Sequence, residues 1–178
     1  MLLDALARLP AALHWRLVHV GGGPLARRLA RRARMLGIAS RVAWRGALDQ
    51  AEVLAEYRAA DLFALASRIA RDGDRDGLPN VLVEAQSQGV ACIATTVSAI
   101  PELIRHGVTG MLVAPESPDQ LARALESLIA DPALRHALGE AGRARVTAEF
   151  ALEANLDRLA RKFGLGSAAA RKVEFARE

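Results

Sequence analysis

Short apolar runs alternate along the chain with longer stretches in which apolar residues follow helical spacing. The apolar runs predict strands at 14–20, 41–44, 61–65, 90–95 and 110–113. Apolar residues that recur every three or four positions predict helices at 2–9, 25–36, 52–57 and 79–88. From residue 118 the pattern is helical to about 163, with breaks near 131 and 150. Residues 164–178 lose the pattern and are predicted to form a loose tail.

Strands that alternate with helices predict an α/β fold with a Rossmann-like, doubly wound parallel sheet and helices on both faces. We expect one domain over residues 1–163, because no linker or repeat divides the pattern. Ligands of such sheets bind outside the carboxyl ends of the strands. The expected binding loops are therefore 21–24, 45–50, 66–78 and 95–101.

Composition narrows the class of protein. Hydrophobic residues make up 52% of the chain, which excludes a disordered protein, and only 4% are aromatic, so an aliphatic core is expected. No apolar stretch is long enough to cross a bilayer and no signal peptide is recognised, so a cytoplasmic protein is expected. The single cysteine, Cys92, excludes an internal disulfide and a cysteine-clustered metal site.

The segment 21–24, Gly-Gly-Gly-Pro, lies between a predicted strand and a predicted helix, where the backbone can approach a ligand closely. Gly21, Gly23 and Ala26 satisfy the loose spacing of a dinucleotide-binding loop. That motif also requires an acidic residue about twenty positions later, and residues 42–45 supply none. An NAD enzyme is therefore not expected, and a simple tight turn explains the glycines equally well.

The segment 72–85 contains the strongest candidate site, an acidic loop that leads into a helix started by Pro79. The free N–H groups of its first turn, near residues 77–81, would bind a phosphate. The Glu84 carboxylate could accept hydrogen bonds from both hydroxyls of a ribose, and Asp76 could reach a hydroxyl at the other end of the same ligand. This arrangement suits a nucleotide diphosphate sugar. The alternative is that Asp76 caps the helix and Glu84 is a solvated surface residue.

Six motifs follow one another along residues 2–163. They are Gly21-x-Gly23-Pro24, Arg41-Val42-x-Trp44-x-Gly46, Ala60-Asp61-Leu62-Phe63, Asp76-Gly77-Leu78-Pro79-Asn80-x-x-x-Glu84-Ala85, Ser98-x-Ile100-Pro101-Glu102-Leu103-Ile104 and Gly107-x-x-Gly110-x-Leu112-Val113. In this order the chain resembles the C-terminal, donor-binding half of the retaining family 4 glycosyltransferases. It is particularly similar to bacterial members that build exopolysaccharide of the colanic acid type.

The resemblance implies one half of a GT-B fold, and an intact enzyme that transfers a hexose with retention from a nucleotide diphosphate sugar to a glycan acceptor in polysaccharide biosynthesis. By this resemblance Glu84 would hold the ribose and Asp76 the donor sugar, as the two catalytic acids. The implied donor-binding residues are Gly21, Gly23, Trp44, Arg45, Gly77, Leu78, Asn80 and Glu84. No metal and no cofactor other than the sugar nucleotide are expected.

The expected partners are the nucleotide diphosphate sugar, a glycan or lipid-linked acceptor and a separate N-terminal acceptor domain. A peripheral contact with the inner membrane face is allowed, and nucleic acid is not expected. The chain has no match to the family's strand that precedes the helix at 2–9 and would lie between the strands at 14–20 and 61–65. An alternative interpretation is therefore a truncated, non-catalytic remnant that binds a nucleotide or a partner protein.

The predicted helix at 25–36 has a basic face opposite its apolar stripe. Its arginines are Arg27, Arg28, Arg31, Arg32 and Arg34. The net charge of +4 permits an anionic membrane or nucleic acid as the partner of this face, and a merely solvated helix face explains it as well.

Overall fold

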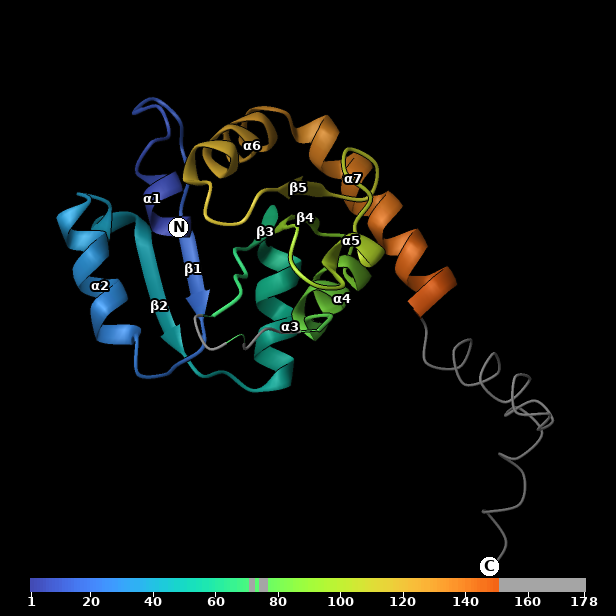
Figure 1. Cartoon of the computed structure of the whole chain (residues 1–178), viewed down its shortest axis with the longest axis horizontal. Coiled ribbons are helices and arrows are strands. Elements are labelled where there is room, and N and C mark those ends of the chain that lie inside the picture. Colours follow the sequence, from blue (N-terminus) through green and yellow to red (C-terminus); the bar gives the residue numbers. More distant parts are fainter. Residues whose placement is uncertain (71–72, 74–76, 151–178) are drawn as a thin grey trace, which may run out of the picture.

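The computed structural model describes residues 1–70, 73 and 77–150 (Figure 1). Its strands are β1 (Leu17–Val20), β2 (Val42–Gly46), β3 (Leu62–Leu65), β4 (Ala91–Thr95) and β5 (Met111–Val113). Its helices are α1 (Leu2–Leu6), α2 (Ala26–Met35), α3 (Gln50–Ala59), α4 (Asn80–Ser87), α5 (Ile100–Leu103), α6 (Pro118–Ala130) and α7 (Pro132–Arg145). A 3₁₀ turn covers Ala39–Arg41, and a π-helical turn covers Val146–Phe150.

All strand pairs of the named strands are parallel, which confirms the predicted α/β class. The strands form two sheets, β1-β2 and β3-β4-β5, instead of the single sheet expected. Within the described residues β1 and β3 each pair along one edge only. The predicted lack of a strand between these two stays a prediction.

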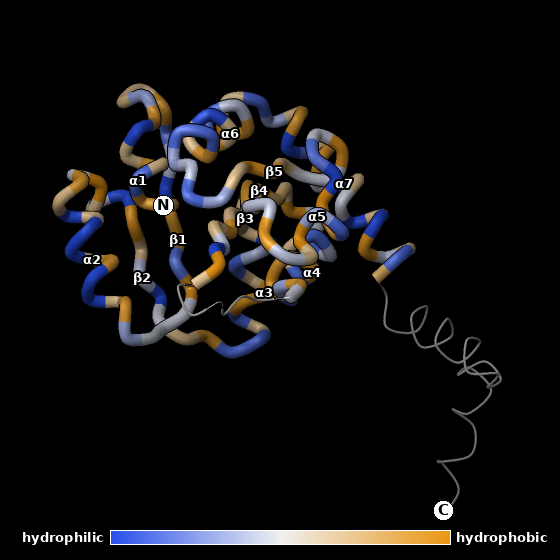
Figure 2. The backbone as a smooth tube through the Cα atoms, viewed as in Figure 1, coloured by the Kyte–Doolittle hydropathy of each residue, from blue (hydrophilic) through white to orange (hydrophobic). Residues whose placement is uncertain are grey.

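The second sheet is buried on both faces, as parallel sheets usually are. Ala91 and Ile93 of β4 pack in one hydrophobic cluster with α6, while Cys92 and Ala94 pack in a second cluster with α4 and α5. The alternation follows from the two-residue period of a strand. Figure 2 shows this sheet as an apolar centre with the polar stretches of the helices outside it.

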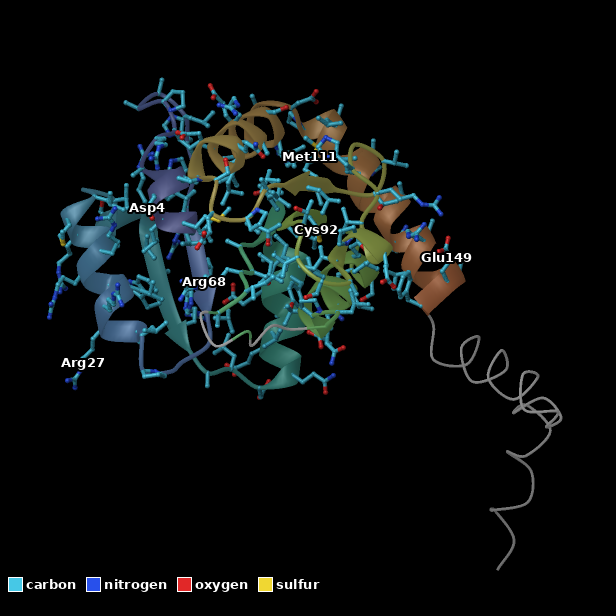
Figure 3. All side chains as sticks on the ribbon, in the orientation of Figure 1. Asp4, Arg27, Arg68, Cys92, Met111 and Glu149 are labelled. Carbon is cyan, nitrogen blue, oxygen red and sulfur yellow. The ribbon has the colours of Figure 1, made fainter. Side chains whose placement is uncertain are left out.

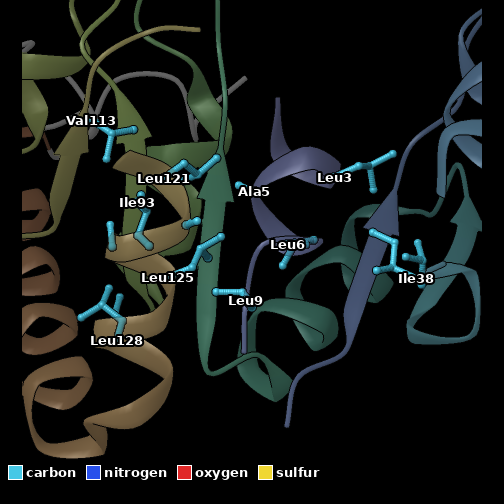
Figure 4. Packing of buried hydrophobic residues seen from close by; sticks show 14 of the residues in the cluster. Leu3, Ala5, Leu6, Leu9, Ile38, Ile93, Val113, Leu121, Leu125 and Leu128 are labelled. Atoms are coloured by element: carbon cyan, nitrogen blue, oxygen red, sulfur yellow. The ribbon is translucent and has the colours of Figure 1, made fainter. Parts of the chain in front are cut away.

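Helix α1 joins the two sheets through the first cluster. Leu6 and Leu9 are 5% and 9% exposed, and they pack in the same cluster as Val42 of β2 and Ile93 of β4. Figure 4 shows Leu6 and Leu9 in the space between the two sheets. Apolar contacts thus continue across the place where backbone pairing stops.

Capping residues set several helix boundaries. Asp49 accepts a hydrogen bond from the Glu52 amide at 2.8 Å, so α3 begins two residues earlier than its apolar pattern indicates. Asp131 accepts one from the Leu134 amide at 2.9 Å and separates α7 from α6, which confirms the predicted break. Helix α1 ends at Leu6, before the predicted residue 9, and α5 was not predicted.

The predicted end of the domain at residue 163 and the tail at 164–178 lie outside the described residues. In the part of the chain that the structure describes, no helix is long and apolar enough to cross a bilayer.

Candidate functional site

The loops at the carboxyl ends of the strands are fixed to one another in pairs. The Gly21 amide, just after β1, donates to the Gly46 carbonyl at the end of β2 at 2.7 Å. The buried Thr95 hydroxyl, at the end of β4, donates to the Ser67 carbonyl after β3, also at 2.7 Å. Each sheet therefore presents a firmly connected pair of loops at the edge where ligands of such folds bind.

The glycine loop after β1 has a backbone that other residues would adopt only with strain. Gly21 and Gly23 have φ angles of +121° and +133°. A Cβ atom at either position would meet no atom within 4 Å, so backbone conformation and not crowding demands glycine. The open space beside both residues is compatible with their predicted place at the nucleotide.

The start of α4 leaves backbone donors available. Pro79 is the N-cap residue and provides no side-chain hydrogen bond, so the amides of Asn80 and Val81 have neither an intrahelical partner nor a side-chain cap among residues 1–70, 73 and 77–150. The Gly77 carbonyl accepts a hydrogen bond from the Ala99 amide at 3.3 Å, which fixes the entry of the helix to the loop after β4. The predicted phosphate-binding end of α4 is thus held at the carboxyl ends of β3 and β4.

Glu84 lies just over one turn into α4 and is exposed. The hydroxyl of Tyr57 on α3 lies 3.4 Å from its Oε2 atom and 3.3 Å from the Val81 carbonyl oxygen, and it can donate to either. Tyr57 itself is only 7% exposed, and its ring packs edge-on against Phe63 of β3. Burial, together with the charge of Glu84, raises the pKa of Tyr57 to about 12, so the hydroxyl stays a donor at neutral pH.

Trp44 and Arg45 follow each other in β2 where its pairing with β1 is irregular, because Trp44 pairs with His19 and Gly46 with Val20, which leaves Arg45 as the extra residue of a bulge. Trp44 is 36% exposed, and the centroid of its ring lies 5.0 Å from that of the His19 ring. The Arg45 Nε atom lies 3.1 Å from the Glu56 Oε1 atom of α3. The two residues thus have different neighbours, Trp44 beside His19 of β1 and Arg45 beside Glu56 of α3.

Among the predicted residues, Gly77, Asn80 and Glu84 gather at the start of α4, with Leu78 half-buried beside them in the second cluster. Gly21 and Gly23 lie at the end of the other sheet. Asp76, the proposed contact to the donor sugar, lies outside the described residues.

Tyr57 and Arg68 were missed by the sequence analysis. Tyr57 reaches Glu84 only because α3 packs beside α4, although it is the single tyrosine of the chain and could have drawn attention for that. Arg68 is an exposed cation in the loop directly after β3, at the predicted ligand edge (Figure 3). Its position directly after a predicted strand is the sequence signal that could have identified it.

A hollow of about 290 Å³ lies at the opposite edge of the second sheet from the candidate site, at the amino ends of β3 and β4. Arg135, which lines it, donates to the carbonyls of Leu128 and Ile129 at 2.6 and 2.9 Å. Because these contacts join α6 to α7, they explain the arginine as a structural residue. Across the described ranges, no group of three or more His, Cys, Asp or Glu is placed to hold a metal ion.

Known proteins are similar to this chain over most of its length. The model of the family "Glycosyl transferases group 1" matches residues 1–145. A GDP-mannose-dependent alpha-(1-6)-phosphatidylinositol monomannoside mannosyltransferase of Mycobacterium tuberculosis is 38% identical over 75% of this chain and 35% of its own length. The amylovoran biosynthesis glycosyltransferase AmsK of Erwinia amylovora is 37% identical over 59% of this chain and 26% of its own length.

Among solved structures, Anabaena Alr3699/HepE in complex with UDP matches with a TM-score of 0.79 and 24% identity, over 92% of this chain and 44% of that protein. This likeness confirms the predicted GT-B class of fold. The chain spans about a third of the length of the mannosyltransferase. With the family model matched over residues 1–145, the chain belongs to the glycosyl transferases group 1 family.

Proposed function

We propose that this chain is the donor-binding half of a hexosyltransferase. The enzyme would transfer a hexose, with retention, from a nucleotide diphosphate sugar to a glycan or lipid-linked acceptor in polysaccharide or glycolipid biosynthesis. The observation that carries the proposal is Glu84, held by the buried Tyr57 just over one turn from the first amides of α4. These groups lie at the carboxyl ends of parallel strands in a chain of this family.

Each group has a part in binding the donor. The amides at the start of α4, which no side chain of the described residues caps, would donate to the diphosphate, whose negative charge the helix dipole also favours. The Glu84 carboxylate would accept hydrogen bonds from the ribose hydroxyls, and the loop at 21–23 would approach the nucleotide. Asp76 would contact the donor sugar. No metal and no further cofactor take part in this proposal.

Proteins similar to this chain support the proposal, because their names state a related activity or ligand. One uses GDP-mannose on a phosphatidylinositol mannoside, another serves amylovoran biosynthesis, and the structural neighbour HepE was solved with UDP. An acceptor-binding domain outside this chain and a cytoplasmic location with peripheral membrane contact belong to the same proposal. The alternative is a non-catalytic remnant that binds the nucleotide and transfers no sugar.

Calorimetric titration of UDP and GDP into the Glu84→Ala variant tests the site. We expect the affinity for the nucleotide that the chain binds to fall about tenfold or more, because charge-assisted hydrogen bonds to the ribose are lost. Glu126→Ala on α6 is the matched control, since Glu126 is also an exposed helical glutamate. Equal affinity of both variants and the unmodified chain, with unchanged melting temperatures, would contradict the assignment of Glu84.

A transfer assay separates an active half from a non-catalytic remnant. Labelled hexose should move from the sugar nucleotide to a lipid-linked or glycan acceptor when a protein that contains both halves is supplied. Nucleotide binding by this chain, with no transfer by the two-half protein, would favour the remnant.

A further inference from the structure

Helix α2 has the densest positive charge in the described part of the chain. Five of its ten residues are arginine and none is acidic. The helix lies at the outer edge of the first sheet, beside β2 (Figure 1), and Figure 3 shows Arg27 projecting away from the body of the molecule. The site described above uses none of these residues.

Four of the arginines share one face. At about 100° per residue, Arg27, Arg28, Arg31 and Arg34 fall within an arc of about 120°. All four are exposed, and they lie opposite the fully buried Ala33. We call these four residues the arginine face. Met35 falls within the same arc and is 70% exposed, so an apolar side chain stands among the guanidinium groups.

The charge of the arginine face is not neutralised within the described residues. Arg32, which lies outside the arc, donates from Nε to the Asp4 carboxylate at 3.0 Å and fixes α2 to α1. No carboxylate among residues 1–70, 73 and 77–150 forms an ion pair with any of the four arginines of the face. Several arginines elsewhere are paired, as Arg45 is with Glu56 and Arg143 with Glu140. The four guanidinium groups are therefore available to an external anionic surface.

Three features favour a lipid surface over nucleic acid. Clusters of four or more basic residues on an amphipathic helix are typical of binding to anionic lipid headgroups. The exposed Met35 suits a surface with an apolar layer beneath its charged layer. Helix α2 contains no aromatic residue that could stack on a base.

We propose that the arginine face of α2, together with Met35, binds the surface of a bilayer that contains anionic lipid. This proposal assigns a surface to the peripheral membrane contact of the proposed function. It rests on the proposed function only in explaining why a membrane contact would be useful. The charge and exposure of α2 support the contact independently of that function. Each headgroup contact would strengthen binding severalfold, so the four together would give a strong dependence on lipid charge.

Co-sedimentation with vesicles, without any nucleotide, tests the proposal. The 178-residue chain is mixed with vesicles of phosphatidylcholine alone and with vesicles that also contain phosphatidylglycerol. We expect binding only to the second kind, and its release as salt is raised, because salt screens charges at a surface. Replacement of all four arginines of the face by glutamine should weaken the partition at least about tenfold. The four lysine replacements should largely retain it.

The matched control removes the same number of charges elsewhere. Replacement of Arg58, Arg105, Arg123 and Arg143 by glutamine alters four dispersed, exposed arginines and should leave most of the binding. Met35→Gln changes no charge and should lower the partition severalfold, because an inserted apolar side chain is lost. If its melting curve shows that the fourfold variant does not fold, the Met35→Gln variant alone tests the proposal.

Three results would overturn the proposal. The first is equal binding to neutral vesicles or no binding to charged ones. The second is an equal loss in the dispersed control variant. The third is tight binding of a duplex oligonucleotide that depends on the arginine face and not on Met35, which would assign the face to nucleic acid. UDP affinity of the fourfold variant is measured separately, so failure of the donor site and failure of the lipid surface are told apart.

Discussion

Tyr57 links the packing of the second sheet to the candidate site through one hydroxyl group. Its ring is buried against Phe63, and its hydroxyl lies between the Val81 carbonyl and the Glu84 carboxylate. Glu84 could be proposed from the sequence because it follows a proline-started helix by a fixed spacing. Tyr57 could not, since its contact with Glu84 joins residues 27 positions apart on separate helices.

Tyr57→Phe keeps the ring and removes the hydroxyl. We expect the free energy of unfolding to fall by about 1 kcal/mol or less. We expect nucleotide affinity to fall severalfold, because the Glu84 carboxylate loses a neighbour that holds it in place. Calorimetry measures the affinity, and urea unfolding measures the stability.

A double-mutant cycle with Glu84→Ala supplies the control. Once Glu84 is removed, Tyr57→Phe should have no further effect on nucleotide binding. An equal loss of affinity in both backgrounds would mean that Tyr57 acts through the fold and not through Glu84.

At the scale of elements, helix α7 approaches β4 through glycine. A methyl group on Gly139 would overlap the Gly89 carbonyl oxygen and come within 3.3 Å of the Ala91 amide nitrogen. The obstacle is backbone on the strand side, which cannot rotate away as a side chain could. The spacing of this helix and strand is therefore fixed by main-chain contact.

Gly139→Ala should lower the free energy of unfolding by about 2–3 kcal/mol, because overpacking against backbone forces α7 outward. Thermal and urea unfolding measure the change. Gly22→Ala is the control, since a Cβ atom there meets nothing within 4 Å. A Gly139→Ala protein as stable as the control would show that α7 shifts freely on the sheet.

The sequence predicts some helices and strands more accurately than others. The break between α6 and α7 is predicted from the local signal of Asp131, whereas the cap Asp49 places the start of α3 two residues before the predicted one. A single sheet is predicted and two are observed, and they divide between β1 and β3, where the resemblance implies a strand that the chain does not match. The short helix α5 escaped because a four-residue element is too brief to show a periodic pattern.

At the scale of the whole molecule, the first hydrophobic cluster crosses from one sheet to the other through α1. Residues that can be used as probes of unfolding lie on both sides of α1. Both tryptophans, Trp15 and Trp44, belong to the β1-β2 half, while Cys92 is fully buried in β4. Burial raises the pKa of the Cys92 thiol and blocks its reaction until the second sheet opens.

We expect the two halves to unfold together, because shared core packing couples them. Tryptophan fluorescence and the labelling of Cys92 during urea titration should give the same midpoint. The Cys92→Ala variant, unreactive to the thiol reagent, controls for labelling of other groups. A fluorescence midpoint at clearly lower urea would show that the first sheet unfolds alone, and that α1 does not join the halves energetically.

The edges of β1 and β3 have a consequence for the behaviour of the chain at high concentration. Within the described residues, each edge presents amide and carbonyl groups without a strand partner. Such an edge is a template for any extended segment, including one from a neighbouring copy. We therefore expect association of copies through these edges, and not weak packing of the core, to limit the solubility of the isolated chain.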